Sequence, residues 1–150
     1  MIAFDSNILI YIGGLVRNDQ DIAKIAAMQT MLANLSGKMQ LFAAVQVLGE
    51  VYHVCQRKGF GRQKSRELVQ ILQDHFTIVD TRHESLIAAM DLATEHNLQI
   101  WDALIVNAAA DAGCTLLLSE DMQDSFQWRG VTIVNPFKDG FDQRLAEVLA

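Results

Sequence analysis

Short apolar runs alternate along the chain with stretches in which apolar residues recur at helical spacing. Brief runs of apolar or β-branched residues are typical of buried strands, and recurrence every three or four residues is typical of amphipathic helices. The expected strands are residues 2–4, 41–44, 76–79, 116–118 and 131–134. This alternation predicts right-handed strand–helix–strand crossovers. We therefore expect a three-layer α/β/α sandwich around a central parallel sheet of about five strands.

Three of the expected helices carry an apolar stripe that should face the core. The stripes are Ile22, Ile25, Leu32 and Leu35; Leu86, Ile87, Met90 and Ala93; and Trp101, Leu104, Ile105 and Ala108. Asn18 and Asp19 are candidate N-caps for the first of these helices. Thr81 and Glu84 have the spacing of a capping box for the second.

Two segments complete the expected organisation. Residues 7–12 are compatible with either a helix or an extended segment. Residues 140–149 predict a short amphipathic helix with the apolar stripe Phe141, Leu145, Val148 and Leu149. With 150 residues, the chain has the size of one ordinary domain. We expect that domain to cover residues 1–137, with residues 138–150 as a helical extension of it.

Composition narrows the class of protein. Half of the residues are hydrophobic, yet no apolar run approaches the roughly eighteen residues of a membrane span. The N-terminus enters an apolar strand without a basic segment or a cleavage site. We therefore expect a soluble cytoplasmic protein with no membrane partner. The two cysteines, Cys55 and Cys114, have no metal-ligand spacing, and we interpret them as packed, reduced thiols.

The net charge of −6 argues against general coating of nucleic acid. Five of the twelve Lys and Arg residues nevertheless lie within ten positions around the turn at residues 59–61. These five are Arg57, Lys58, Arg62, Lys64 and Arg66. They form either an edge that contacts phosphates or a solvated corner between two helices.

Four acidic residues have the most informative positions: Asp5, Glu50, Asp102 and Asp121. Asp5 and Asp121 each follow an expected strand, so parallel strands would bring them to one edge of the sheet. Glu50 lies about two turns into an apolar helix, where a lone carboxylate costs several kcal/mol or stays protonated. Glu50 could instead reach solvent, and Asp102 or Asp5 could simply stabilise a helix N-terminus.

Together, the four carboxylates predict a site for one or two Mg²⁺ or Mn²⁺ ions, which prefer oxygen ligands. His53, one turn after Glu50, is either a substrate contact or an ordinary packed histidine. The sequence contains no Cys/His triad, nucleophile elbow or phosphate-cradling glycine loop. Metal-assisted hydrolysis is therefore favoured over covalent catalysis.

Four segments of the chain resemble, in order, the successive motifs of PIN domains, and most closely those of VapC-type toxin ribonucleases. They are residues 2–7 (IAFDSN), 46–51 (QVLGEV), 101–105 (WDALI) and 117–124 (LLSEDMQD). The resemblance spans residues 2–136. It implies a PIN fold and a metal-dependent endoribonuclease that cleaves phosphodiester bonds in RNA as the toxin of a type II toxin–antitoxin pair.

The resemblance also implies roles for individual residues. The four acids would be catalytic and would bind the metal, with support from three polar residues, Asn7, Ser119 and Asp124. Asp124 competes with Asp121 for the place of the fourth acid. Ser125 departs from the family pattern, because many relatives have glycine there.

The implied partners are RNA, a small antitoxin and a second copy of the chain. Tyr11, Tyr52 and the C-terminal stripe are candidates for protein contacts, or else part of the core.

Other functions stay open: a PIN-like RNA-processing nuclease, or a non-catalytic RNA-binding or scaffold protein on the same fold. A haloacid-dehalogenase-type phosphatase is disfavoured because Asn7 stands where a second acid is needed. A receiver-like domain is disfavoured because it lacks the strand-end lysine.

Overall fold

A computed structural model describes residues 1–139 and 143–150 of the chain. Its elements are, in order, β1 (Ile2–Phe4), α1 (Ser6–Ile12), α2 (Asp21–Leu35), β2 (Leu41–Ala44), α3 (Val45–Arg57), α4 (Gly61–Gln73), β3 (Thr77–Val79), α5 (His83–His96), α6 (Ile100–Asp111), β4 (Leu116–Leu118), β5 (Gln127–Trp128), β6 (Val131–Val134) and α7 (Gln143–Leu149). Within these residues, no helix combines the length and apolar character that a membrane span requires.

The strands form one sheet in the order β3-β2-β1-β4-β6-β5. Every neighbouring pair is parallel except β5 and β6, which are antiparallel. The predicted α/β sandwich and its five parallel strands are thus confirmed, but the sheet has six strands. The additional strand, β5, has only two residues and does not coincide with an apolar run. Hydrophobic periodicity therefore could not predict it.

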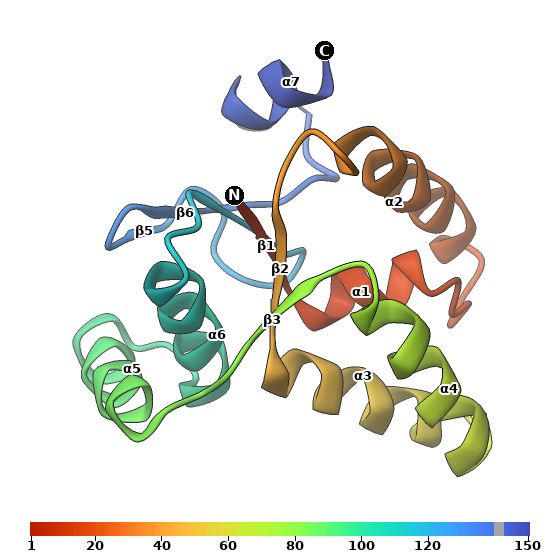
Figure 1. The fold of residues 1–150 in the computed structure, drawn as a ribbon, viewed down its shortest axis with the longest axis horizontal. Coiled ribbons are helices and arrows are strands. Elements are labelled where there is room, and N and C mark those ends of the chain that lie inside the picture. Colours follow the sequence, from red (N-terminus) through yellow and green to blue (C-terminus); the bar gives the residue numbers. More distant parts are fainter. Residues whose placement is uncertain (140–142) are drawn as a thin grey trace.

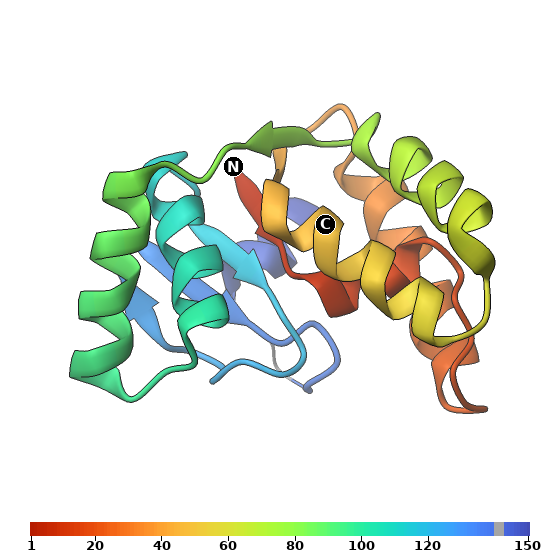
Figure 2. The same cartoon turned by 90° about the horizontal axis from the view of Figure 1, so that it is seen from below.

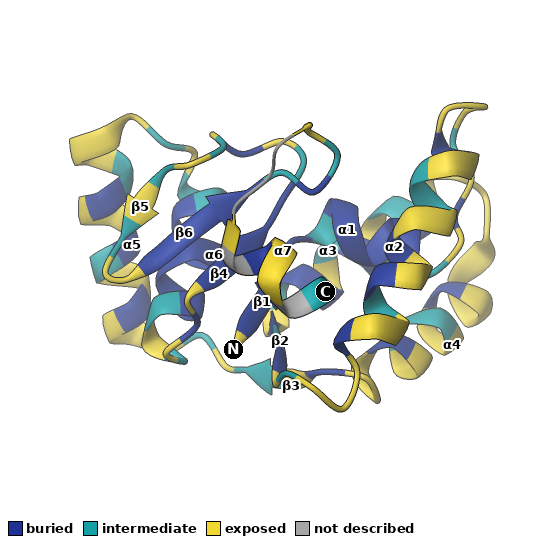
Figure 3. Ribbon diagram, turned by 90° about the horizontal axis from the view of Figure 1, so that it is seen from above, coloured by how far each residue is buried: buried dark blue, intermediate teal, exposed yellow. Residues whose placement is uncertain are grey.

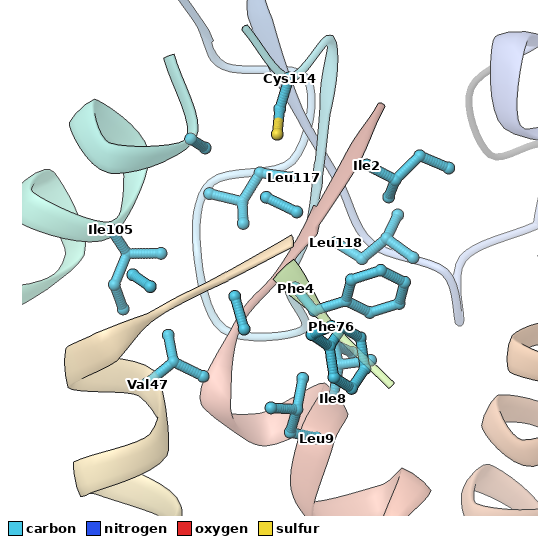
Figure 4. Close-up of a cluster of buried hydrophobic side chains, with 14 of the residues drawn as sticks. Ile2, Phe4, Ile8, Leu9, Val47, Phe76, Ile105, Cys114, Leu117 and Leu118 are labelled. Carbon is cyan, nitrogen blue, oxygen red and sulfur yellow. The ribbon is translucent and has the colours of Figure 1, made fainter. Parts of the chain in front are cut away.

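Helices cover both faces of the sheet (Figure 1). Helices α5 and α6 lie on one side, and α1, α2, α3 and α4 lie on the other. Between the layers, Figure 4 shows Phe4 and Leu118 of the central strands surrounded by buried aliphatic and aromatic side chains. The Phe4 and Phe76 rings meet edge to face, with 5.1 Å between their centroids. This core fixes the strand ends that carry the acidic residues.

The burial of two helices differs from the predicted stripes (Figure 3). In α2, Ile22 is exposed, and Met28 and Met31 are buried instead. In α5, the face at Leu86, Ile87 and Met90 is exposed, whereas the smaller residues Ser85 and Ala89 are buried with Leu92. Helix α5 packs on the alanine-rich α6, and small side chains allow that close approach.

The predicted helix caps are wrong. Gln20 occupies the N-cap position of α2 and makes no side-chain cap, while the Asn18 side chain accepts a hydrogen bond from the Gln20 amide ahead of the helix. The capping box at Thr81 does not form, because the Thr81 hydroxyl donates to Gln46 on α3 at 3.1 Å. A tertiary hydrogen bond has replaced the local one.

The ambiguous and C-terminal segments both contain helices. Residues 7–12 belong to α1, whose Tyr11 is buried in the core rather than exposed. The predicted C-terminal helix is α7, and its Leu145 packs into the same core. Phe141 and the side chain of Val148 lie outside the described residues. Tyr52, the other tyrosine considered for protein contacts, is half-buried.

Candidate active site

Asp5 occupies the point where β1 ends and α1 begins. It is the N-cap of α1, and its Oδ1 accepts a hydrogen bond from the Ser6 amide at 2.7 Å. Its Oδ2 accepts from Asn7 Nδ2 at 2.9 Å and from Ser119 Oγ at 2.7 Å. Asp5 is only 4% exposed. The Ser6 hydroxyl adds a longer bond to Oδ1 at 3.4 Å. Donors from three residues therefore hold this buried carboxylate in one orientation.

Asn7 connects Asp5 to the loop that follows β4. Its Nδ2 also donates to Asp121 Oδ2 at 3.2 Å, and its Oδ1 accepts from the Glu120 amide at 3.2 Å. Ser119 Oγ accepts in turn from the Met122 amide at 3.2 Å. Because β1 and β4 are neighbours in the sheet, these bonds span only the gap between two strand ends. The predicted meeting of Asp5 and Asp121 at one edge is therefore found.

Glu50 and Asp102 reach the same edge from two helices. Glu50 lies in α3, which starts directly after β2, and Asp102 lies in the first turn of α6. Both are half-buried. Figure 2 looks onto this edge of the sheet, where β1 ends between α6 on one side and α3 on the other.

The pKa values show that the carboxylates act on one another. Burial raises the pKa of Asp5 to about 6, opposed by the bonds from Ser119 and Ser6 and increased further by the charges of Glu50 and Asp102. Burial and the charge of Asp102 raise the pKa of Glu50, whereas the Ser6 side chain lowers it. Burial and the charge of Asp121 raise the pKa of Asp102. The four acids thus form one electrostatic cluster, which protons or a cation would stabilise.

The donor set of this cluster fits a hard, hydrated cation. Among residues 1–139 and 143–150, no group of three or more His, Cys, Asp or Glu side chains is placed so that it could hold a metal ion. Mg²⁺ does not need such a group, because it keeps several waters and binds through one or two carboxylates together with substrate phosphates. Asp5 and its acidic neighbours supply carboxylate oxygens of the kind that Mg²⁺ prefers.

Two clefts open beside the acidic cluster. The first has a volume of about 570 Å³ and is lined by Ser6, Gln46, Gly49, Glu50, His53, Val54 and Trp101. The second has a volume of about 210 Å³ and includes Asp102 and Asp121 in its wall, with Met122, Gln123 and Phe126. Trp101 was predicted to be buried and is instead 60% exposed in the first cleft. Glu50 therefore lines the larger cleft, and Asp102 and Asp121 line the smaller one.

Asp124 lies apart from the cluster, although it is close to Asp121 in sequence. Its Oδ1 accepts from the Asn135 amide at 2.8 Å, and its Oδ2 pairs with Lys138 at 3.4 Å. These contacts fasten the loop to the end of β6. Asp121, which shares Asn7 with Asp5, is the better candidate for the fourth acid. Ser125 adopts the left-handed conformation, with φ of +67°, at the position where glycine was expected.

The five basic residues occupy a separate surface, the corner between α3 and α4. Arg57, Lys58, Arg62, Lys64 and Arg66 are all exposed. Within the described part of the chain, none of them forms an ion pair. Arg57 follows Glu50 by seven residues in α3, a rise of about 10 Å along the helix axis. The corner thus begins about 10 Å along the helix axis from the acidic cluster.

One group of residues near the site was missed by sequence reasoning. Glu120, in the loop after β4, forms an ion pair with Lys24 of α2. Its Oε2 also accepts from the Tyr11 hydroxyl at 2.5 Å. Lys24 belongs to none of the sequence motifs, and Glu120 lies in a stretch that contains other acidic residues. Neither residue could therefore be recognised from the sequence as half of an ion pair. The pair with Lys24 holds the Glu120 side chain of this loop. Asn7 holds the same loop through its bonds to the Glu120 amide and to Asp121.

Comparisons with known proteins agree with this architecture. A toxin–antitoxin complex from Klebsiella pneumoniae contains a chain 20% identical, with a TM-score of 0.59 over 88% of this chain and 96% of that one. VapC20 of Mycobacterium tuberculosis, a toxin that cleaves the sarcin–ricin loop, is 16% identical, with a TM-score of 0.64 over 78% and 87%. VapBC2 from Rickettsia felis, bound to a DNA fragment from its promoter, is 16% identical, with a TM-score of 0.62 over 89% and 97%.

No curated protein sequence matches the chain. The family model of the PIN domain, in contrast, matches residues 2–126, which include all four acids. The solved structures share the fold at low sequence identity, and the family model shares the sequence pattern. The chain therefore belongs to the PIN domain family.

Proposed function

We propose that the protein is a metal-dependent endoribonuclease. PIN domains are generally nucleases, and the matched range of the present chain contains the four carboxylates of the acidic cluster. The observation that carries the proposal is the environment of Asp5. This residue is buried, held by donors from three residues and flanked by the charges of Glu50 and Asp102. Such a group is costly for the fold without a cation, and it is ready to bind one.

Asp5, Glu50, Asp102 and Asp121 would hold one or two Mg²⁺ or Mn²⁺ ions. When bound, the metal would supply positive charge at the scissile phosphate and lower the pKa of a water. The chain's own contribution is orientation. Ser119 and Asn7 fix the rotamer of Asp5, and Asn7 couples Asp5 to Asp121. The site therefore needs no histidine as a general base.

We propose that the corner between α3 and α4 binds the RNA backbone. Its five cations are exposed and free of acidic partners among the described residues, so they can pair with phosphates. The rest of this acidic protein repels RNA, which favours approach from this side.

We further propose that the protein is the toxin of a type II toxin–antitoxin pair in the cytoplasm. The support is the fold shared with VapC20 and with the chains of two toxin–antitoxin assemblies. A small antitoxin and a second copy of the chain are the proposed protein partners. A PIN-like RNA-processing nuclease is the second candidate, because its site would contain the same acids.

Cleavage of single-stranded RNA tests the enzymatic proposal. We expect cleavage with Mg²⁺ or Mn²⁺ and none with chelator. Asp5→Asn and Glu50→Gln should each lose at least about 100-fold in rate, the scale on which loss of a single group that stabilises a transition state lowers kcat. Asp91→Asn, the same change at an exposed position of α5, is the matched control. Cleavage that persists in chelator, or in both site variants, would contradict the mechanism.

Expression in bacteria separates the toxin from the RNA-processing nuclease and from a non-catalytic scaffold. A toxin should arrest growth when it is expressed alone, and the Asp5→Asn variant should not. Co-expression of the reading frame adjacent to its gene should restore growth. Normal growth with an active enzyme would identify a processing nuclease, and absence of cleavage would leave the scaffold.

A further inference from the structure

Trp101 is the large aromatic residue whose exposure the fold does not explain. It lies in the first turn of α6, directly before Asp102, and 60% of its surface is exposed. Tryptophan is highly buried on average, because water solvates its large ring poorly. The side chain lines the larger cleft together with Glu50 and His53. An exposed indole therefore stands beside the acidic cluster.

The position of Trp101 is held by other elements. Gln46 Nε2 of α3 donates to the Trp101 carbonyl at 3.2 Å, and Gln46 Oε1 accepts from the Thr81 hydroxyl at 3.1 Å. These two bonds tie the first turn of α6 to α3 and to the segment after β3. The ring is thus exposed on a fixed backbone rather than on a loose chain end.

The space in front of the ring is open. A methyl group added at Gly49, which shares the cleft wall, would meet no atom within 4 Å. The cleft volume of about 570 Å³ is within the range of pockets that take small organic groups, about 300–1,000 Å³. Apolar and aromatic side chains form one part of its wall, and the Glu50 carboxylate forms another. This combination suits a planar, uncharged group attached to a phosphate that reaches the acids.

We propose that Trp101 stacks on a nucleobase of single-stranded RNA, next to the phosphate held at the acidic cluster. The inference rests on the proposed nuclease function and adds to it a residue that would position the substrate. Single-stranded RNA is recognised by stacking of splayed bases on aromatic side chains, and every base offers a suitable face. A paired base is already stacked within its helix and cannot enter the cleft. His53 is the second ring available in the same cleft.

Cleavage kinetics give the first test. With Mg²⁺ and a short single-stranded oligoribonucleotide of mixed sequence, Trp101→Ala should raise KM by about 5- to 150-fold, the effect of losing one stacked base. Trp101→Phe should stay near the wild type because it keeps an aromatic face. The fully paired duplex of the same sequence should be a poor substrate, and Trp101→Ala should not change its cleavage. Trp128→Phe, at a partly buried position of β5, is the control.

Fluorescence gives a second test that does not depend on cleavage. In the Trp128→Phe variant, Trp101 is the only remaining tryptophan. Single-stranded RNA should quench its emission, and the duplex should not. If the wild type cleaves RNA but the KM of Trp101→Ala is unchanged and no quenching occurs, the stacking proposal is wrong and the nuclease stands. A protein partner would then be the better occupant of the cleft. If RNA quenches Trp101 but is never cleaved, stacking stands and the nuclease proposal fails.

Discussion

The buried carboxyl of Asp5 makes the stability of the metal-free protein depend on pH in an unusual direction. Its pKa is raised from 3.8 to about 6 on folding. Between these two values the folded state binds more protons than the unfolded state, so the free energy of unfolding falls as pH rises. The contribution of Asp5 is fully favourable below about pH 4 and is lost as pH rises through about 6. The shift of about two pKa units corresponds to about 3 kcal/mol.

The perturbation that isolates this effect is Asp5→Asn, which cannot titrate. In chelator, the free energy of unfolding of the wild type minus that of the variant should fall by about 2 kcal/mol between about pH 4.5 and 7. Urea unfolding at each pH, followed by far-UV circular dichroism, measures both values. Other acids that titrate alike in the two proteins cancel in this difference.

A bound cation should remove the effect. Metal binds the deprotonated carboxylate, so millimolar Mg²⁺ should stabilise the wild type above about pH 6 and leave the variant unchanged. The reasoning is refuted if the difference between wild type and variant is constant, or rises, over that pH interval in chelator. Either result would mean that the Asp5 carboxyl ionises in the fold at no cost.

Three further predictions address the loop after β4 and the basic corner. Ser125→Gly should stabilise the protein by about 1 kcal/mol in urea unfolding, because φ of +67° is strained for serine; a destabilised variant would contradict this. Lys24→Met should cost about 1–2 kcal/mol by breaking the partly buried pair with Glu120, and an unchanged midpoint would mean that solvent screens the pair. Replacing Arg62 and Lys64 together by Ala should flatten the salt dependence of RNA binding, measured by fluorescence anisotropy; an unaltered slope would place the RNA elsewhere.

The sequence predicted the strands and the acidic edge because both follow from strong local signals. Each predicted strand is an apolar run, and Asp5 and Asp121 follow two strands that turn out to be neighbours. Any parallel sheet brings such residues to one edge, whatever its other details. The cost of burying Glu50 alone was a further signal; in the structure Glu50 is half-buried, with the Ser6 side chain as a hydrogen-bond partner and the like charge of Asp102 nearby.

The errors came from interactions that only the tertiary structure determines. Met90 and Trp101 lie on apolar stripes, but a stripe shows which faces are able to pack and not which neighbour is available. Helix α5 packs against the alanine-rich helix α6, and the small residues of α5 are therefore the buried ones. Thr81 has the spacing of a capping box with Glu84, but its hydroxyl instead donates a hydrogen bond to Gln46 on another helix. The Lys24 and Glu120 pair joins residues 96 positions apart, and no local pattern encodes it.

Neutral donors explain how an acidic edge forms before any cation arrives. Ser6, Asn7 and Ser119 supply four hydrogen bonds to Asp5, and Asn7 donates one more to Asp121. An aspartate at position 7 would put a further negative charge between these two carboxylates, whereas the amide donates to both. The site is therefore built by uncharged groups, which fix the geometry of the acids without neutralising them. The charge that remains is what a metal ion, and through it an RNA phosphate, would compensate.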